Sequence, residues 1–131
     1  MTVLVGYVNN PAGHAALDAG IAQAKKDGRE LIVVNASRSA QRNDSYRLGE
    51  GELKSVNTYL ARADVEFRVL TLGSEFDPAE QILDTATEVG AELIVLGTRK
   101  RTPVGKFLLG STIQKVILDA EAPVLCVKAA H

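Results

Sequence analysis

The chain has a single cysteine and no tryptophan among its 131 residues. Cys126 therefore has no partner for an intramolecular disulfide, cysteine-based zinc clusters are excluded, and such usage is typical of a reducing cytoplasm. Long hydrophobic runs are missing too. No apolar stretch approaches the roughly 18 residues of a membrane span, and the start lacks the basic region of a signal peptide. These absences predict an untargeted, cytoplasmic protein.

Neither sign of charge dominates, because 15 Lys and Arg stand against 16 Asp and Glu, giving a formal net charge of -1. This balance provides no general attraction to nucleic acid or to an anionic membrane. The hydrophobic share of 46% and the charged share of 24% are typical of soluble globular proteins. The length predicts one domain over residues 1–131.

What the sequence does contain is an alternation of strand-like and helix-like hydrophobic patterns. Short apolar runs rich in β-branched residues alternate with segments whose apolar residues recur at helical spacing, which predicts five strands and four amphipathic helices. Because several runs are apolar almost throughout, the strands are expected to be buried on both faces of a parallel sheet. The predicted fold class is α/β, a doubly wound five-stranded parallel sheet in a Rossmann-like three-layer αβα sandwich. The predicted strands are Val3–Val8, Leu31–Val34, Val65–Leu72, Leu93–Leu96 and Val124–Val127.

Local signals mark the ends of the helices. The first helix should begin at Asn10-Pro11 and end at Gly28, the third should run from Asp77-Pro78 to Gly90, and the fourth should begin at Ser111. The polar stretch Ser37–Gly49 interrupts this pattern and is predicted to be a loop, which either covers a site or faces solvent.

The segment after the fourth predicted strand, residues 97–112, is rich in glycine and in basic side chains. Gly110, Ser111 and Thr112 would present backbone N–H groups and hydroxyls at the positive end of a helix dipole, which favours phosphate. Four cations add a positive local field. The alternative is that these cations are only solvated and that Ser111 is an ordinary helix cap. The four are Arg99, Lys100, Arg101 and Lys106.

Common catalytic motifs are missing. Position 100 is Lys and Lys106 is followed by Phe107, so the loop is not a Walker A motif, and no G-x-G-x-x-G or G-x-S-x-G pattern occurs. Two histidines are too few for a metal cluster. The sequence therefore favours a protein that is not an enzyme, although a positive loop is compatible with slow ATP hydrolysis. A flavin carrier on the same scaffold is disfavoured by an aromatic content of 5%.

The chain resembles the universal stress protein family, small α/β domains of which many bind ATP. Gly97, Gly110 and Ser111 match the family's G-x2-G-x9-G-[S/T] loop, and Pro123–Val127 matches its closing P-V-L-x-V strand. The opening VLVGYVNNPAGHAAL is also similar to the family's first strand and helix. The match covers essentially the whole chain.

This resemblance implies a stress-response regulator or sensor that binds ATP or a related adenine nucleotide, with Val8 and Val34 beside the base. The sequence departs from the family in two places. Lys100 replaces the motif's second glycine, where it either narrows the backbone's approach to phosphate or donates charge, and Val8 replaces an acidic residue. The implied nucleotide-binding residues are Val8, Asn9, Asn10, Val34, Gly97, Arg99, Lys100, Gly105, Gly110, Ser111 and Thr112.

The resemblance also implies a homodimer formed through the last strand. The apolar run there would leave an exposed sheet edge, which isolated proteins usually protect. Because of the two departures, a nucleotide-free module that docks a regulatory protein partner is kept as the alternative function. The predicted interface residues are Val124, Leu125, Cys126 and Val127.

Overall fold

The computed structural model describes residues 1–37, 47–73, 77–98 and 110–129. Strands and helices alternate along the chain, and one parallel sheet has the strand order β3-β2-β1-β4-β5. The predicted fold class is confirmed. The elements are β1 (Thr2–Gly6), α1 (Pro11–Asp27), β2 (Glu30–Ser37), α2 (Glu50–Arg62), β3 (Phe67–Gly73), α3 (Pro78–Val89), β4 (Ala91–Thr98), α4 (Ser111–Asp119) and β5 (Val124–Lys128).

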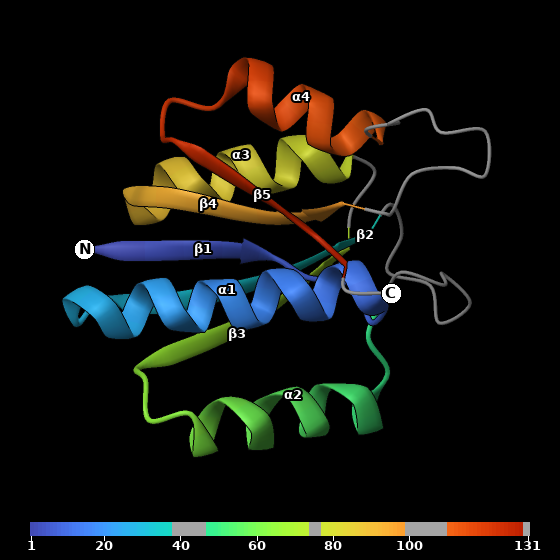
Figure 1. Cartoon of the computed structure of the whole chain (residues 1–131). Coiled ribbons are helices and arrows are strands. Elements are labelled where there is room, and N and C mark those ends of the chain that lie inside the picture. Colours follow the sequence, from blue (N-terminus) through green and yellow to red (C-terminus); the bar gives the residue numbers. More distant parts are fainter. Residues whose placement is uncertain (38–46, 74–76, 99–109, 130–131) are drawn as a thin grey trace.

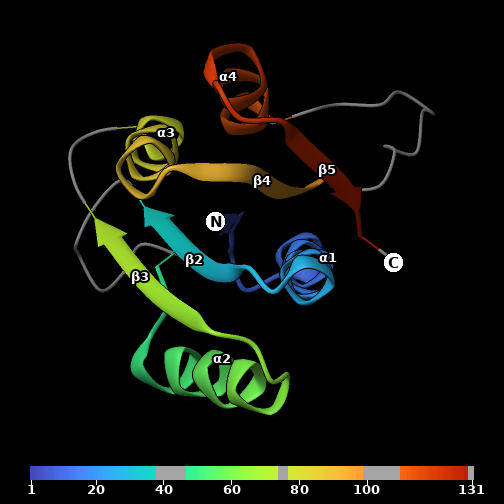
Figure 2. The same ribbon diagram turned by 90° about the vertical axis from the view of Figure 1, so that its left-hand side faces the viewer.

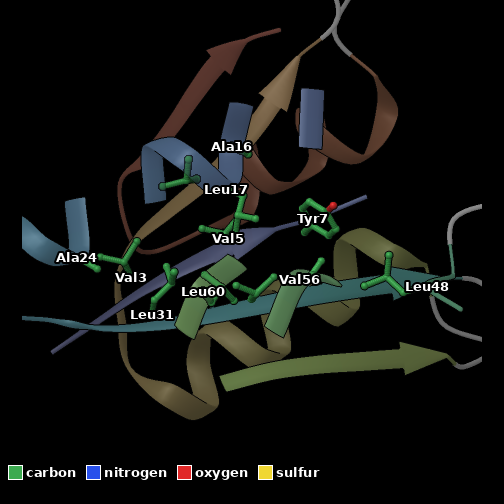
Figure 3. Close-up of a cluster of buried hydrophobic side chains, with 12 residues drawn as sticks. Val3, Val5, Tyr7, Ala16, Leu17, Ala24, Leu31, Leu48, Val56 and Leu60 are labelled. Atoms are coloured by element: carbon green, nitrogen blue, oxygen red, sulfur yellow. The ribbon is translucent and has the colours of Figure 1, made fainter. Parts of the chain in front are cut away.

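The helices cover the two faces of the sheet in pairs. Figures 1 and 2 show α1 and α2 on one face and α3 and α4 on the other. Successive strand residues point to opposite faces, so Val3 and Val5 pack under α1 and α2 (Figure 3), whereas Leu4 packs under α3 and α4. The central strands are thus buried on both sides, as their apolar runs predict.

The predicted helix ends agree with the structure. Asn10 caps α1 through its side-chain oxygen, which accepts a 2.8 Å hydrogen bond from the Gly13 N–H, and Asp77 caps α3 in a similar way. Gly28 and Gly90 close α1 and α3 at φ of 62° and 63°, left-handed conformations that favour glycine. Local chemistry therefore sets these boundaries.

Several boundaries differ from the prediction. β2 and β4 extend beyond the predicted Leu31–Val34 and Leu93–Leu96 at both ends, and other differences concern β1, β3 and the predicted loop. β1 ends at Gly6 rather than Val8, because the Asn10 N–H donates to the Val8 carbonyl at 2.8 Å and turns the chain into α1. The strand predicted from Val65 begins at Phe67, after Asp64 with φ of 60°. Leu48, in the predicted loop, is only 6% exposed and belongs to the core, while residues 38–46 lie outside the described ranges.

Candidate functional site at the carboxyl edge of the sheet

The central strands β1 and β4 are neighbours whose following helices lie on opposite faces. In open α/β sheets, ligands bind at the carboxyl ends of the strands, at the point where the strand order reverses and successive helices pass to opposite faces. Every strand pair is parallel, so the carboxyl ends of the strands lie at one edge of the sheet, and Figure 1 shows α4 beginning on that side. The candidate site is this edge.

The beginning of α4 provides backbone donors. Gly110 is its N-cap residue and makes no side-chain capping bond, and the first helical bond runs from the Gln114 N–H to the Gly110 carbonyl at 3.1 Å. The N–H groups of Ser111, Thr112 and Ile113 therefore precede the first bond of the helix and need other partners. They lie at the positive end of the helix dipole, where an anion is favoured.

The nearest described basic side chain of α4 already has partners. Lys115 Nζ lies 2.8 Å from Glu80 Oε1 and 3.8 Å from Asp77 Oδ2 at the start of α3. The hydrogen bond to Glu80 raises the pKa of Lys115. This ion pair joins α4 to α3, so within the described residues the attraction for an anion comes mainly from the backbone of α4.

The two predicted polar contacts after β1 have partners within the chain. Asn10 caps α1, as described above, and Asn9 donates from Nδ2 to Glu52 at 2.7 Å. The side-chain oxygen of Asn9, Oδ1, also lies 2.9 Å from His14 Nε2. A nucleotide would have to compete with these bonds to use either side chain.

The predicted apolar contacts differ in their burial. Val8 is half-buried and retains surface for a ligand, but Val34 is 0% exposed within the core under α3 and α4. A base would reach Val34 only if neighbouring side chains moved. Three further predicted residues, Arg99, Lys100 and Gly105, lie outside the described ranges.

Gly97 lies at the same edge but in close contact with the chain itself. A Cβ atom at position 97 would overlap the carbonyl group of Ala12 at the start of α1. Gly110 is the opposite case, because a Cβ there would meet no atom of the described residues within 4 Å. Packing therefore requires the first glycine of the loop motif, whereas packing leaves the last one free.

The structure also contains a cavity that the sequence did not reveal. A hollow of about 410 Å³ lies between α1 and α2, on the face of the sheet opposite α4. Its polar residues recur at helical spacing, at positions 14 and 18 on α1 and at 52, 55 and 59 on α2. This spacing is the signal in the sequence from which the cavity could have been predicted. The lining residues are Tyr7, Asn9, His14, Leu17, Asp18, Glu52, Ser55, Val56 and Tyr59.

Two tyrosines of this cavity hold their protons more strongly than usual. Burial, with a smaller effect of Glu52, raises the pKa of Tyr7. The hydrogen bond from the Tyr59 hydroxyl to Asp18 Oδ1, 2.5 Å long, raises the pKa of Tyr59. Both phenols therefore stay neutral beyond the pH at which free tyrosine ionises.

We expect an absorbance titration of tyrosinate to show both groups ionising above pH 10, the ordinary tyrosine pKa. Because the fold favours the protonated phenols, their contribution to stability is present below pH 10 and is lost as the pH rises through the raised pKa values. Tyr59→Phe should remove one transition, and Asp18→Asn should move the Tyr59 midpoint back toward 10. An unmoved midpoint in Asp18→Asn would contradict the role of that hydrogen bond.

The last strand, β5, pairs with β4 along one side, and the described chain places no strand along its other side. Its first four residues are half-buried. Burial raises the pKa of the Cys126 thiol, which disfavours the reactive thiolate. On nearby α4, Leu118 is 81% exposed and Ile117 is 42% exposed. This end of the sheet therefore offers apolar surface.

The described residues contain no group of three or more His, Cys, Asp or Glu side chains placed to hold a metal ion. Nor is any helix in residues 1–37, 47–73, 77–98 and 110–129 long and apolar enough to cross a membrane.

Comparison with known proteins agrees with this architecture. The sequence profile of the Universal stress protein family matches residues 1–128. A universal stress protein of Mycolicibacterium smegmatis is 37% identical over 126 residues, 96% of each chain. The structure of one from Archaeoglobus fulgidus superposes with a TM-score of 0.81 at 28% identity, covering 97% of each chain. The structure of a further universal stress protein, in complex with cAMP, superposes with a TM-score of 0.68 at 26% identity and covers 99% of this chain and 98% of that one. This chain therefore belongs to the universal stress protein family.

Proposed function

We propose that this protein binds ATP or a related adenine nucleotide at the carboxyl edge of β1 and β4. The observation that carries the proposal is the start of α4, whose backbone donors precede the first helical bond and have no side-chain cap. Phosphate oxygens are the acceptors that such a helix end favours. The relative solved in complex with cAMP supports an adenine nucleotide as the ligand class.

In this arrangement the phosphates lie against the N–H groups of residues 111–113, with the hydroxyls of Ser111 and Thr112 as further donors. Val8, half-buried after β1, gives the base an apolar wall. The basic and glycine residues of 99–109 add charge and close approach, as the sequence predicts. The binding energy comes mainly from charge-assisted hydrogen bonds to phosphate.

The proposed role is that of a cytoplasmic stress-response regulator or sensor that acts by binding rather than by catalysis. Membership of the universal stress protein family supports the stress-response role.

We also propose a homodimer formed through Val124, Leu125, Cys126 and Val127. The open side of β5 and the exposed Leu118 and Ile117 support this interface, because a second copy would cover both.

Gly110→Val is expected to weaken ATP binding about tenfold or more, a loss of about 1.4 kcal/mol, because a branched side chain would stand between phosphate and the helix N–H groups. Folding should be unaffected, since a Cβ at position 110 meets no atom within 4 Å in the part of the chain that the structure describes. Calorimetric titration with ATP would measure the affinity, and circular dichroism would check the fold.

Gly49→Val is the matched control for that variant. Gly49 is also a helix N-cap without a side-chain capping bond, at α2, and among the described residues a Cβ there meets only Glu52 Oε1, at 3.6 Å. ATP affinity should stay unchanged in this variant. Equal affinities of Gly110→Val, Gly49→Val and the unaltered protein would exclude the start of α4 as the phosphate site.

The alternative function is a nucleotide-free module of the same fold that docks an acidic regulatory protein through the basic segment. Val8 favours this alternative. It stands after β1 at the position where nucleotide-binding members of the family usually carry an acidic residue, and it is apolar. The two functions are separated by denaturing freshly purified protein, identifying any released nucleotide by mass, and titrating the stripped protein. A stoichiometric adenine nucleotide supports the proposed function, and no binding at millimolar ATP supports the docking module.

A further inference from the structure

The cavity between α1 and α2 has the size and layering of a small-molecule site. Its volume of about 410 Å³ lies within the roughly 300–1,000 Å³ that is usual for ligand pockets. The floor is apolar, since Leu17 and Val56 are almost completely buried. Exposed polar groups from both helices form the rim. A ligand with an apolar body and a polar end would match these two layers.

The rim is negatively charged. Asp18 on α1 and Glu52 on α2 both line the cavity, and no lysine or arginine is among its described lining residues. Neutral groups donate to both carboxylates, the Tyr59 hydroxyl to Asp18 and the Asn9 amide to Glu52. These donors orient the carboxylates without neutralising them. The rim therefore attracts a cation and repels an anion.

Aromatic side chains make up part of the wall. Tyr7 lies deep in the cavity at 4% exposure, and Tyr59 stands at the rim at 48% exposure. Tyrosine rings attract cations placed over their faces and also pack well against flat apolar groups. Neither ring carries a charge near neutral pH, because the ordinary tyrosine pKa of 10.0 lies far above it and the fold raises the pKa of both tyrosines further. The cavity thus combines carboxylates with neutral aromatic surface.

We propose that this cavity is a second binding site, which takes a small organic cation, an amine with an apolar or aromatic body. The ammonium group lies between the carboxylates of Asp18 and Glu52, and the apolar body packs against Leu17, Val56 and the tyrosines. The cavity shares Asn9 with the predicted nucleotide contacts, but it lies on the opposite face of the sheet from α4, where the phosphates are proposed to bind. It does not depend on nucleotide binding.

The test uses three probes that share an indole ring and differ in charge: tryptamine, tryptophol and indole-3-acetate. The chain contains no tryptophan, so the indole fluorescence of each probe can be followed without a tryptophan background. At neutral pH we expect tryptamine to bind saturably with a Kd below about 1 mM. The neutral tryptophol should bind more weakly, and the anionic acetate should not bind.

Variants that each remove one carboxylate test whether these charges bind the ammonium group. Asp18→Asn and Glu52→Gln keep a carbonyl acceptor for the Tyr59 and Asn9 donors but remove one negative charge each, and each should raise the Kd for tryptamine about fivefold. Asp84→Asn is the matched control, because it makes the same charge change at an exposed position of α3 on the other face. It should leave the Kd unchanged.

Three outcomes would overturn the proposal. The first is no saturable binding of tryptamine, the second is equal binding of tryptamine and tryptophol, and the third is an equal effect of Asp18→Asn and Asp84→Asn. Gly110→Val separates this proposal from the nucleotide proposal, because that variant should bind tryptamine normally even where its ATP affinity is lost. Failure of one proposal therefore leaves the other testable.

Discussion

Gly97→Ala is expected to lower the free energy of unfolding by about 3 kcal/mol, the cost of overpacking against atoms that cannot move aside. The new Cβ would overlap the backbone carbonyl of Ala12, at the start of α1. A side chain could change its rotamer to avoid the contact, but a backbone carbonyl moves only with its helix. The first turn of α1 would have to lift from β4.

The control is Gly51→Ala in α2. A Cβ at position 51 meets no atom of residues 1–37, 47–73, 77–98 and 110–129 within 4 Å, and alanine favours a helix over glycine, so this variant should gain about 0.5–1 kcal/mol. Urea unfolding followed by circular dichroism would measure both variants. A Gly97→Ala protein as stable as the unaltered chain would show that α1 does not press on β4 at this point.

Asn35→Ala is expected to cost a similar amount, about 3 kcal/mol, because it leaves two buried backbone groups without a partner. Asn35 is 0% exposed; its Nδ2 donates to the Tyr7 carbonyl at 2.9 Å, and its Oδ1 accepts from the Leu48 N–H at 3.0 Å. The side-chain amide of Asn35 thus links Tyr7, directly after β1, to Leu48, just before α2.

Asn57→Ala separates that effect from the loss of any asparagine. Asn57 Nδ2 donates to the Leu53 carbonyl at 2.9 Å, within α2 and only partly buried, so its removal should change stability by less than about 0.5 kcal/mol. Thermal and urea unfolding of the two variants provide the comparison. Similar losses in Asn35→Ala and Asn57→Ala would refute the structural role of the buried amide.

The sheet and its helices were predictable because their signals are local. Asn10, Gly28, Asp77 and Gly90 act within one turn of chain, through a cap or a left-handed φ. The nearly continuous apolar runs likewise predicted burial on both faces. These features depend on neighbours in the sequence, so the sequence alone was sufficient.

The cavity and the buried amide were not predictable in this way, because each joins segments far apart in the chain. Asn9 and Glu52 are separated by 43 positions and Asn35 and Tyr7 by 28, yet both pairs form hydrogen bonds. Leu48 appeared to belong to a polar loop, but the bond from its N–H to Asn35 holds it beside the core. Such positions follow from the register of whole elements rather than from local pattern.

The contact between Gly97 and Ala12 also has a consequence for how relatives of this protein diverge. Selection for a stable domain alone should retain glycine at position 97, even in a lineage that has lost its ligand. The described residues place no such steric demand on position 110, so drift is free to replace that glycine once binding no longer matters. Of the two motif glycines, only the later one is therefore informative about whether a descendant still binds phosphate.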